Sequence, residues 1–143
     1  MKHIFIVNPI AGRGKHQEKI VGKIKTACER GGYSFEILYT NGPGDAEKIA
    51  ATYPPDEDAR FYAIGGDGTF NEMINGIMGR GKGEAALIPC GTGDDFVRIF
   101  QDKAPFLAIE RQLEGTAQPI DLMKVSGRYA ANLCNLGIDA ETA

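Results

Sequence analysis

The segment that most constrains the fold is an apolar run that ends in a glycine-rich turn. Phe61 to Ile64 is continuous and apolar, which predicts a strand buried on both faces. Gly65-Gly66-Asp67-Gly68-Thr69 follows, and an apolar helical periodicity begins at Phe70. The turn is typical of a phosphate site, because glycines permit positive φ angles and close approach, and a helix's first amides lack partners. Asp67 would repel a phosphate, so its position indicates a divalent cation between the two.

The alternation of strand and helix continues along the chain. Further strands are expected at Ile4 to Val7, Ser34 to Thr40 and Ala85 to Ile88, with a hairpin formed by Ile120 to Val125 and Tyr129 to Leu133. This order predicts an α/β fold, a three-layer nucleotide-binding domain with a mostly parallel sheet. Ligands bind beyond the carboxyl ends of such strands, so three glycine-bearing loops are expected to meet there. These loops are Asn8 to Gly14, Gly65 to Thr69 and Gly91 to Asp95.

Composition excludes several classes of protein. The 143 residues suffice for one domain, and a net charge of −3 argues against nucleic acid as a partner. The sequence has no run of 18 apolar residues, so it predicts no membrane span. The first apolar stretch is too short for a signal peptide. Three widely spaced cysteines and two histidines favour neither a disulfide framework nor a zinc site. A reducing cytoplasmic compartment is therefore expected.

Two common nucleotide fingerprints are absent. Gly14-Lys15 has the end of a P-loop, but Pro9 stands where the first glycine is needed and His16 follows the lysine. Around Asp67 the glycines are residues 65, 66 and 68 and residue 71 is Asn, so the dinucleotide pattern G-x-G-x-x-G is also absent.

What remains resembles the diacylglycerol kinase catalytic domain family, which includes sphingosine kinases and bacterial lipid kinases. Five motifs carry the resemblance in order: Val7 to Gly12; Thr40 with Gly44-Asp45-Ala46; Gly65 to Gly76; Pro89 to Arg98; and Asn132 to Ala140. The turn at Gly65 to Thr69 is shared with NAD kinases and phosphofructokinases, so the ordered set carries more weight than that turn.

The resemblance implies binding of ATP and Mg²⁺. It places nucleotide contacts at Asn8, Pro9, Ile10, Ala11, Gly12, Thr40, Gly65, Gly66, Asp67, Gly68, Thr69, Phe70, Asn71, Glu72, Gly91 and Thr92. It places Mg²⁺ ligands at Asp67, Asp95 and Asp121. Residues 1–143 would be the ATP-binding domain of a two-domain cytoplasmic lipid kinase that meets its lipid substrate at the inner face of the membrane. The general base would lie in a β-rich C-terminal domain, so no catalytic residue is expected in this chain.

Other interpretations of the same residues stay open. The chain could belong to an NAD kinase-like enzyme, or to a nucleotide-binding module without catalysis. Asn71 and Glu72 could support the first helical turn, Asp95 could cap a helix, and Asp121 could be an exposed strand residue. Asp94 stands where the family usually has Asn, and we expect it to point to solvent, because a second carboxylate beside phosphate is unfavourable.

Overall fold

The computed structural model describes residues 1–90 and 93–131. Within these residues, four parallel strands form one sheet in the order β2-β1-β3-β4. Their bounds are β1 Lys2–Val7, β2 Phe35–Tyr39, β3 Ala59–Gly65 and β4 Glu84–Pro89. The predicted parallel α/β fold is therefore confirmed.

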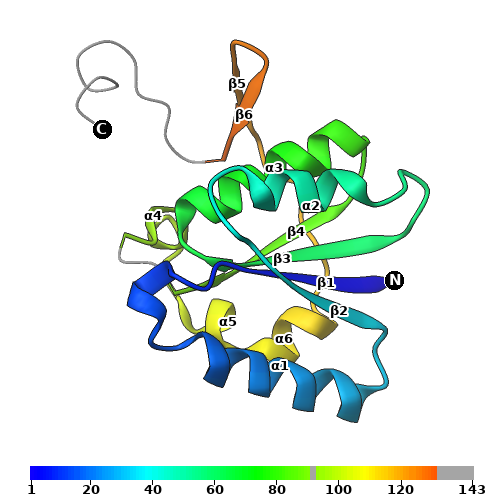
Figure 1. Ribbon diagram of the computed structural model, residues 1–143, viewed down its shortest axis with the longest axis vertical. Coiled ribbons are helices and arrows are strands. Elements are labelled where there is room, and N and C mark those ends of the chain that lie inside the picture. The colour runs from blue at the N-terminus through cyan, green and yellow to red at the C-terminus, as the bar shows by residue number, and fades with distance from the viewer. Residues whose placement is uncertain (91–92, 132–143) are drawn as a thin grey trace.

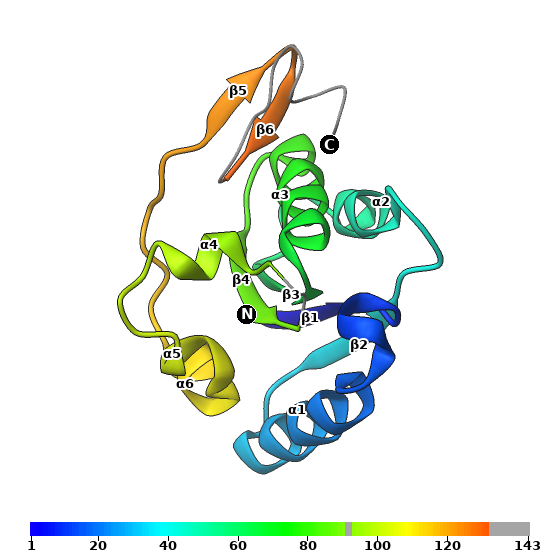
Figure 2. The ribbon, with the colours of Figure 1, turned by 90° about the vertical axis from the view of Figure 1, so that its left-hand side faces the viewer.

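Helices cover both faces of the sheet, which gives three layers. Figures 1 and 2 show α2 and α3 on one face and α1, α5 and α6 on the other, with α4 at the end of the sheet. The helices are α1 Gln17–Gly31, α2 Asp45–Thr52, α3 Asp67–Arg80, α4 Asp95–Arg98, α5 Ala104–Leu107 and α6 Ile109–Glu114, and a 3-10 turn, η1, spans Ala11–Gly14.

The two-residue period of the strands produces two separate hydrophobic cores. Ile4 and Ile6 of β1 pack with α2 and α3, whereas Phe5 and Val7 pack with α1 and α6. All seven residues of β3 are buried, as expected for a central strand covered on both faces. This packing fixes where each strand ends, and therefore where each following loop begins.

The predicted hairpin is shorter than its sequence pattern. Met123–Val125 (β5) pairs antiparallel with Arg128–Ala130 (β6), and Asp121 lies outside the strand, exposed. The expectation of a strand from Ile120 was wrong at its first residues. The second predicted strand, Tyr129 to Leu133, extends to residues 132 and 133, which lie outside the described residues.

Candidate phosphate site

The loops that follow β1 and β3 are joined at the carboxyl edge of the sheet. Nδ2 of Asn8 donates a hydrogen bond to Oγ1 of Thr69 over 3.1 Å. Oδ1 of Asn8 accepts the backbone N–H of Ile10 at 3.2 Å, which holds the start of the first loop. The predicted convergence of these two loops is confirmed by direct contact.

The first loop also meets the end of β4. Gly12 has a φ of +56°, and a Cβ on it would lie 2.2 Å from the carbonyl oxygen of Cys90. Only glycine accommodates both this backbone conformation and this approach. Gln17, which is 4% exposed, fixes the backbone of this loop, because its side-chain amide donates to the carbonyls of Asn8 and Ala11.

In the turn before α3, Gly65 is required for close packing rather than for a positive φ. None of Gly65, Gly66 and Gly68 has a positive φ, so that part of the expectation was wrong. A Cβ on Gly65 would lie 2.6 Å from Oγ1 of Thr69, so the threonine hydroxyl fits only against a bare backbone. The first amides of α3, at Asp67, Gly68 and Thr69, form the helix N-terminus predicted for phosphate.

Asp67 joins α3 to α4. Its Oδ2 accepts the backbone N–H of Asp95 at 2.9 Å, and its Oδ1 accepts that of Phe96 at 3.0 Å. A carboxylate at a helix N-terminus satisfies amides and complements the helix dipole. Asp95, the first residue of α4, is exposed and forms an ion pair with Arg98 at 3.5 Å.

Glu72 and Thr40 tie the loop after β2 to the site. Oε1 of Glu72 accepts the backbone N–H of Gly44 at 2.9 Å, across two segments of the predicted motif set. Thr40 is 7% exposed, and its backbone N–H donates to the carbonyl of Val7 at 2.9 Å. Both residues therefore position loops around the α3 N-terminus.

The remaining residues that were predicted to contact nucleotide differ in how exposed they are. Phe70 is 3% exposed and packs against Phe96 with a ring-centroid distance of 4.7 Å, so it belongs to the core. Pro9 and Ile10 are exposed, and Ala11 is partly exposed. Gly91 and Thr92, and the motif Asn132 to Ala140, lie outside the described residues.

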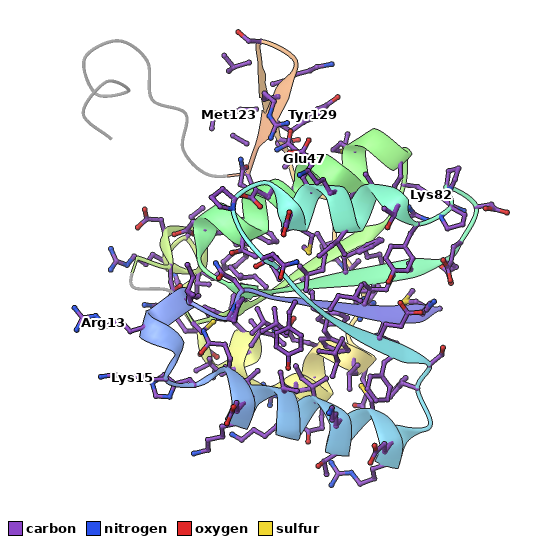
Figure 3. The ribbon with its side chains drawn as sticks, viewed as in Figure 1. Arg13, Lys15, Glu47, Lys82, Met123 and Tyr129 are labelled. Carbon is purple, nitrogen blue, oxygen red and sulfur yellow. The ribbon has the colours of Figure 1, made fainter. Side chains whose placement is uncertain are left out.

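A pocket of about 270 Å³ opens at this junction. Its lining residues are Asp67, Gly68, Phe70, Asn71, Asp95, Phe96 and Ala131. Figure 3 shows the side chains of Arg13 and Lys15 projecting away from the domain at the same end of the sheet. A larger cavity of about 610 Å³ beside β4 has a mostly apolar lining that includes neither Asp67 nor Thr69, so it is not the phosphate site.

Asp67 and Asp95 are suited to Mg²⁺. The Oδ2 atom of Asp67 lies 3.5 Å, and the Oδ1 atom of Asp95 4.0 Å, from the position that a Cβ on Gly93 would take, so both carboxylates border Gly93. Mg²⁺ is commonly held by one or two carboxylates together with substrate phosphates. Within the described residues no three acidic, His or Cys side chains form a metal cluster, so Asp121 does not join this pair there. The three-carboxylate site stays a prediction.

We expected Asp94 to point to solvent, and the structure contradicts this expectation. Its Oδ1 is shielded from solvent, and the residue adopts a left-handed conformation with a φ of +49° at the start of α4. Burial raises the pKa of the Cys90 thiol to about 11, and the nearby charge of Asp94 adds to the rise. A thiol held protonated is a poor nucleophile, which agrees with a packing role for Cys90.

Two polar residues of the site region escaped sequence reasoning. Gln17 resembles an ordinary first residue of a helix, and Asn75 resembles a polar residue on its surface. Both are buried, at 4% and 7% exposure, and both bond backbone groups of other segments. A buried polar side chain of this kind needs partners, but sequence spacing does not reveal them.

Fold and site together define an α/β domain whose glycine-bearing loops gather round a helix N-terminus at one sheet edge. The family model of the diacylglycerol kinase catalytic domain matches residues 2–125, and the chain belongs to this family.

Individual relatives agree with this membership. The chain is 33% identical over 139 residues to a diacylglycerol kinase of Bacillus subtilis (strain 168), covering 93% of this chain and 45% of that protein. A diacylglycerol kinase of Staphylococcus saprophyticus is 32% identical, with 90% and 43% covered. A crystal structure of a diacylglycerol kinase from Bacillus anthracis str. Sterne superposes with a TM-score of 0.75 at 30% identity, covering 90% of this chain and 45% of that one. The chain thus spans less than half the length of the curated relatives it matches.

Proposed function

We propose that this chain is the nucleotide-binding half of an ATP- and Mg²⁺-dependent lipid kinase, with diacylglycerol as the first candidate acceptor. Family membership supports kinase chemistry, and the names of the relatives support the lipid. The observation that carries the proposal is the junction of Asn8, Thr69 and Asp67, which places a hydroxyl, a carboxylate and helix amides at one edge.

Different residues of the site would contact the phosphates and the metal ion. Phosphoryl transfer depends mainly on positioning and charge neutralisation. The first amides of α3 would donate to phosphate oxygens, and Asn8 would fix Thr69 beside them. Asp67 and Asp95 would hold Mg²⁺, which neutralises the charge that develops on the phosphates.

The acceptor side of the reaction is assigned to a second domain. By the family resemblance, the general base and the lipid cleft would lie in a further β-rich domain of the protein. The protein would work in the cytoplasm and contact the inner membrane face peripherally. Among the helices described in residues 1–90 and 93–131, none combines the length and hydrophobicity needed to cross a bilayer.

One pair of experiments tests the proposal. Titration calorimetry of this chain with Mg-ATP should give saturable binding that weakens in Asp67→Asn. Labelled ATP, extracted lipids and the protein as the cell makes it should put label into the organic phase. Label on NAD instead would favour the NAD kinase alternative, and binding without transfer to either would favour a non-catalytic module. A folded chain that binds no Mg-ATP would remove the basis of the nucleotide site.

A further inference from the structure

The hairpin of β5 and β6 is held against α3 by one buried amide. Nδ2 of Asn75 donates to the carbonyl oxygen of Tyr129 at 2.8 Å, and its Oδ1 accepts the backbone N–H of Tyr129 at 2.9 Å. The same Nδ2 donates to the carbonyl of Asn71 at 2.9 Å, so the side chain is also fixed to its own helix. Asn75 therefore pairs with Tyr129 through both backbone groups, as a neighbouring strand would.

Two further contacts hold the same hairpin. Oδ1 of Asn71 accepts the backbone N–H of Ala131 at 3.4 Å. Arg128, which is exposed, forms a bidentate ion pair at 2.8 and 2.7 Å with Glu47 of α2, which is partly exposed. Figure 3 shows Tyr129 and Glu47 close together where the hairpin meets α2 and α3. The hairpin thus rests on both helices of this face.

The end of the hairpin is a wall of the phosphate pocket. Ala131 lines that pocket together with Asp67 and Asn71, and it directly follows the strand that Asn75 holds. Asn71 contributes to the pocket and also bonds Ala131. The shape of the pocket therefore depends on the hairpin remaining against α3.

The position of the β5–β6 hairpin depends on α3, because α3 is itself firmly packed in the domain. A Cβ on Gly76, next to Asn75, would lie 2.3 Å from the carbonyl oxygen of Glu47, so α3 packs directly on the α2 backbone. The hairpin has three paired residues on each strand, and β5 is exposed throughout. A hairpin this small is marginal by itself and takes its position from its anchors.

We propose that Asn75 is a positioning residue of the phosphate site: it holds the β5–β6 wall in place, so phosphate binding and hairpin docking favour each other. The pocket's role as a phosphate site rests on the proposed function. If ligand binds better with the wall in place, occupancy must stabilise the docked hairpin by the same factor.

The first measurement concerns the wall without ligand. Amide exchange of Tyr129 and Ala131 is compared between the wild-type chain, Asn75→Ala and the control Thr26→Ala, whose hydroxyl bonds only within α1, to Gly22. Loss of the paired amide should speed exchange at both residues about tenfold, with β1 and β3 unchanged. Equal exchange in Asn75→Ala and wild type would overturn the proposal.

The second measurement adds Mg-ATP. Binding should slow exchange at Tyr129 and Ala131 in the wild type about fivefold or more, and Asn75→Ala should raise the Kd about tenfold. The control Thr26→Ala should match the wild type in both readouts. A loosened hairpin with an unchanged Kd would overturn the positioning role and leave the proposed function standing.

A wild-type chain that binds no Mg-ATP would instead remove the proposed function and, with it, the role in phosphate binding, while the exchange data still decide whether Asn75 holds the hairpin. Should Asn75→Ala fail to fold, Arg128→Ala tests the same point, because it removes an exposed anchor. It should speed hairpin exchange and raise the Kd in the same direction by a smaller factor. No change in either would overturn the proposal.

Discussion

The Asn8 side chain donates a hydrogen bond to the Thr69 hydroxyl over 3.1 Å, although 61 positions separate the two residues. The bond locks the loop after β1 to the first turn of α3. Since Thr69 is 7% exposed, water cannot readily replace the lost partner if either group is removed. Folding and ligand geometry therefore depend on the same contact.

Thr69→Val keeps the shape of the side chain and removes the hydroxyl. We expect the free energy of unfolding to fall by about 1–2 kcal/mol, because the amide of Asn8 loses its acceptor. Mg-ATP affinity should fall as well, whereas Thr69→Ser should keep most of both. Urea denaturation and calorimetry measure the two quantities. Equal behaviour of the Val and Ser variants would show that the hydroxyl is not needed.

Asp67 should contribute to stability as well as to metal binding. Asp67→Ala removes the acceptor of two α4 amides and should cost about 1–2 kcal/mol of unfolding free energy. Asp67→Asn keeps one acceptor oxygen and should cost less, yet it should still weaken Mg²⁺-dependent ATP binding. Asp121→Asn, at an exposed position, should leave the unfolding free energy within about 0.5 kcal/mol. If Asp121→Asn weakens Mg²⁺-dependent binding as much as Asp67→Asn, the three-carboxylate site gains support.

Substitution by alanine should change the free energy of unfolding in opposite directions at two glycines of α3. At Gly76 a Cβ would meet the backbone of Glu47 and Cβ of Ala50 at 2.7 Å, so Gly76→Ala should force α2 from α3 and cost about 1–3 kcal/mol. At Gly79 nothing lies within 4 Å, so Gly79→Ala should stabilise the helix by about 0.5–1 kcal/mol. Thermal or urea unfolding compares the two, and a tolerated Gly76→Ala would contradict the tight α2–α3 contact.

His3 should make stability depend on pH. Burial lowers the pKa of its imidazole below the usual 6.5, and the charges of Arg60 and the N-terminus act in the same direction, against Glu84. The folded chain thus binds fewer protons than the unfolded chain below pH 6.5, and stability falls as pH falls through that value.

His3→Gln should remove part of the loss of unfolding free energy between pH 7.5 and 5.5. Urea titrations at the two pH values provide the measurement. The same pH dependence in wild type and His3→Gln would exclude His3 as its source.

Asp94→Asn should make Cys90 more acidic. The Asp94 charge is one of two causes that raise the pKa of this thiol to about 11, so its removal should lower that pKa, although burial still keeps it high. Asn tolerates the left-handed backbone at this position, so the fold should survive.

Peptide mapping of alkylation rates against pH follows each cysteine separately. Cys28, whose pKa is raised to about 11 by burial and Glu29, is the internal control and should not change. An unchanged Cys90 profile would contradict the electrostatic contact with Asp94. A large gain in Mg-ATP affinity in Asp94→Asn would mean that the Asp94 charge opposes phosphate binding.

Sequence patterns predicted the strands well because burial on both faces is a local property. The run Phe61 to Ile64 lies within β3, and Ile4 to Val7 within β1. The hairpin was less well predicted, because β5 begins at Met123 and not at Ile120. The bounds of a two-stranded hairpin are set by a few cross-strand residue pairs, which the sequence pattern does not reveal. Local pattern also placed the glycine turn before α3, but it predicted positive φ angles there, whereas none of these glycines has one and Gly65 packs closely against Thr69.

The sequence by itself determined an α/β domain with parallel strands, and it placed Asn8, Asp67 and Thr69 at strand ends, since apolar runs and glycine turns are written in consecutive residues. Only the tertiary structure decided that Asp67 caps α4, that Glu72 holds Gly44 and that Asn75 holds Tyr129. These partners lie 28, 28 and 54 positions apart in the chain, so their pairing follows from how the helices pack on the sheet.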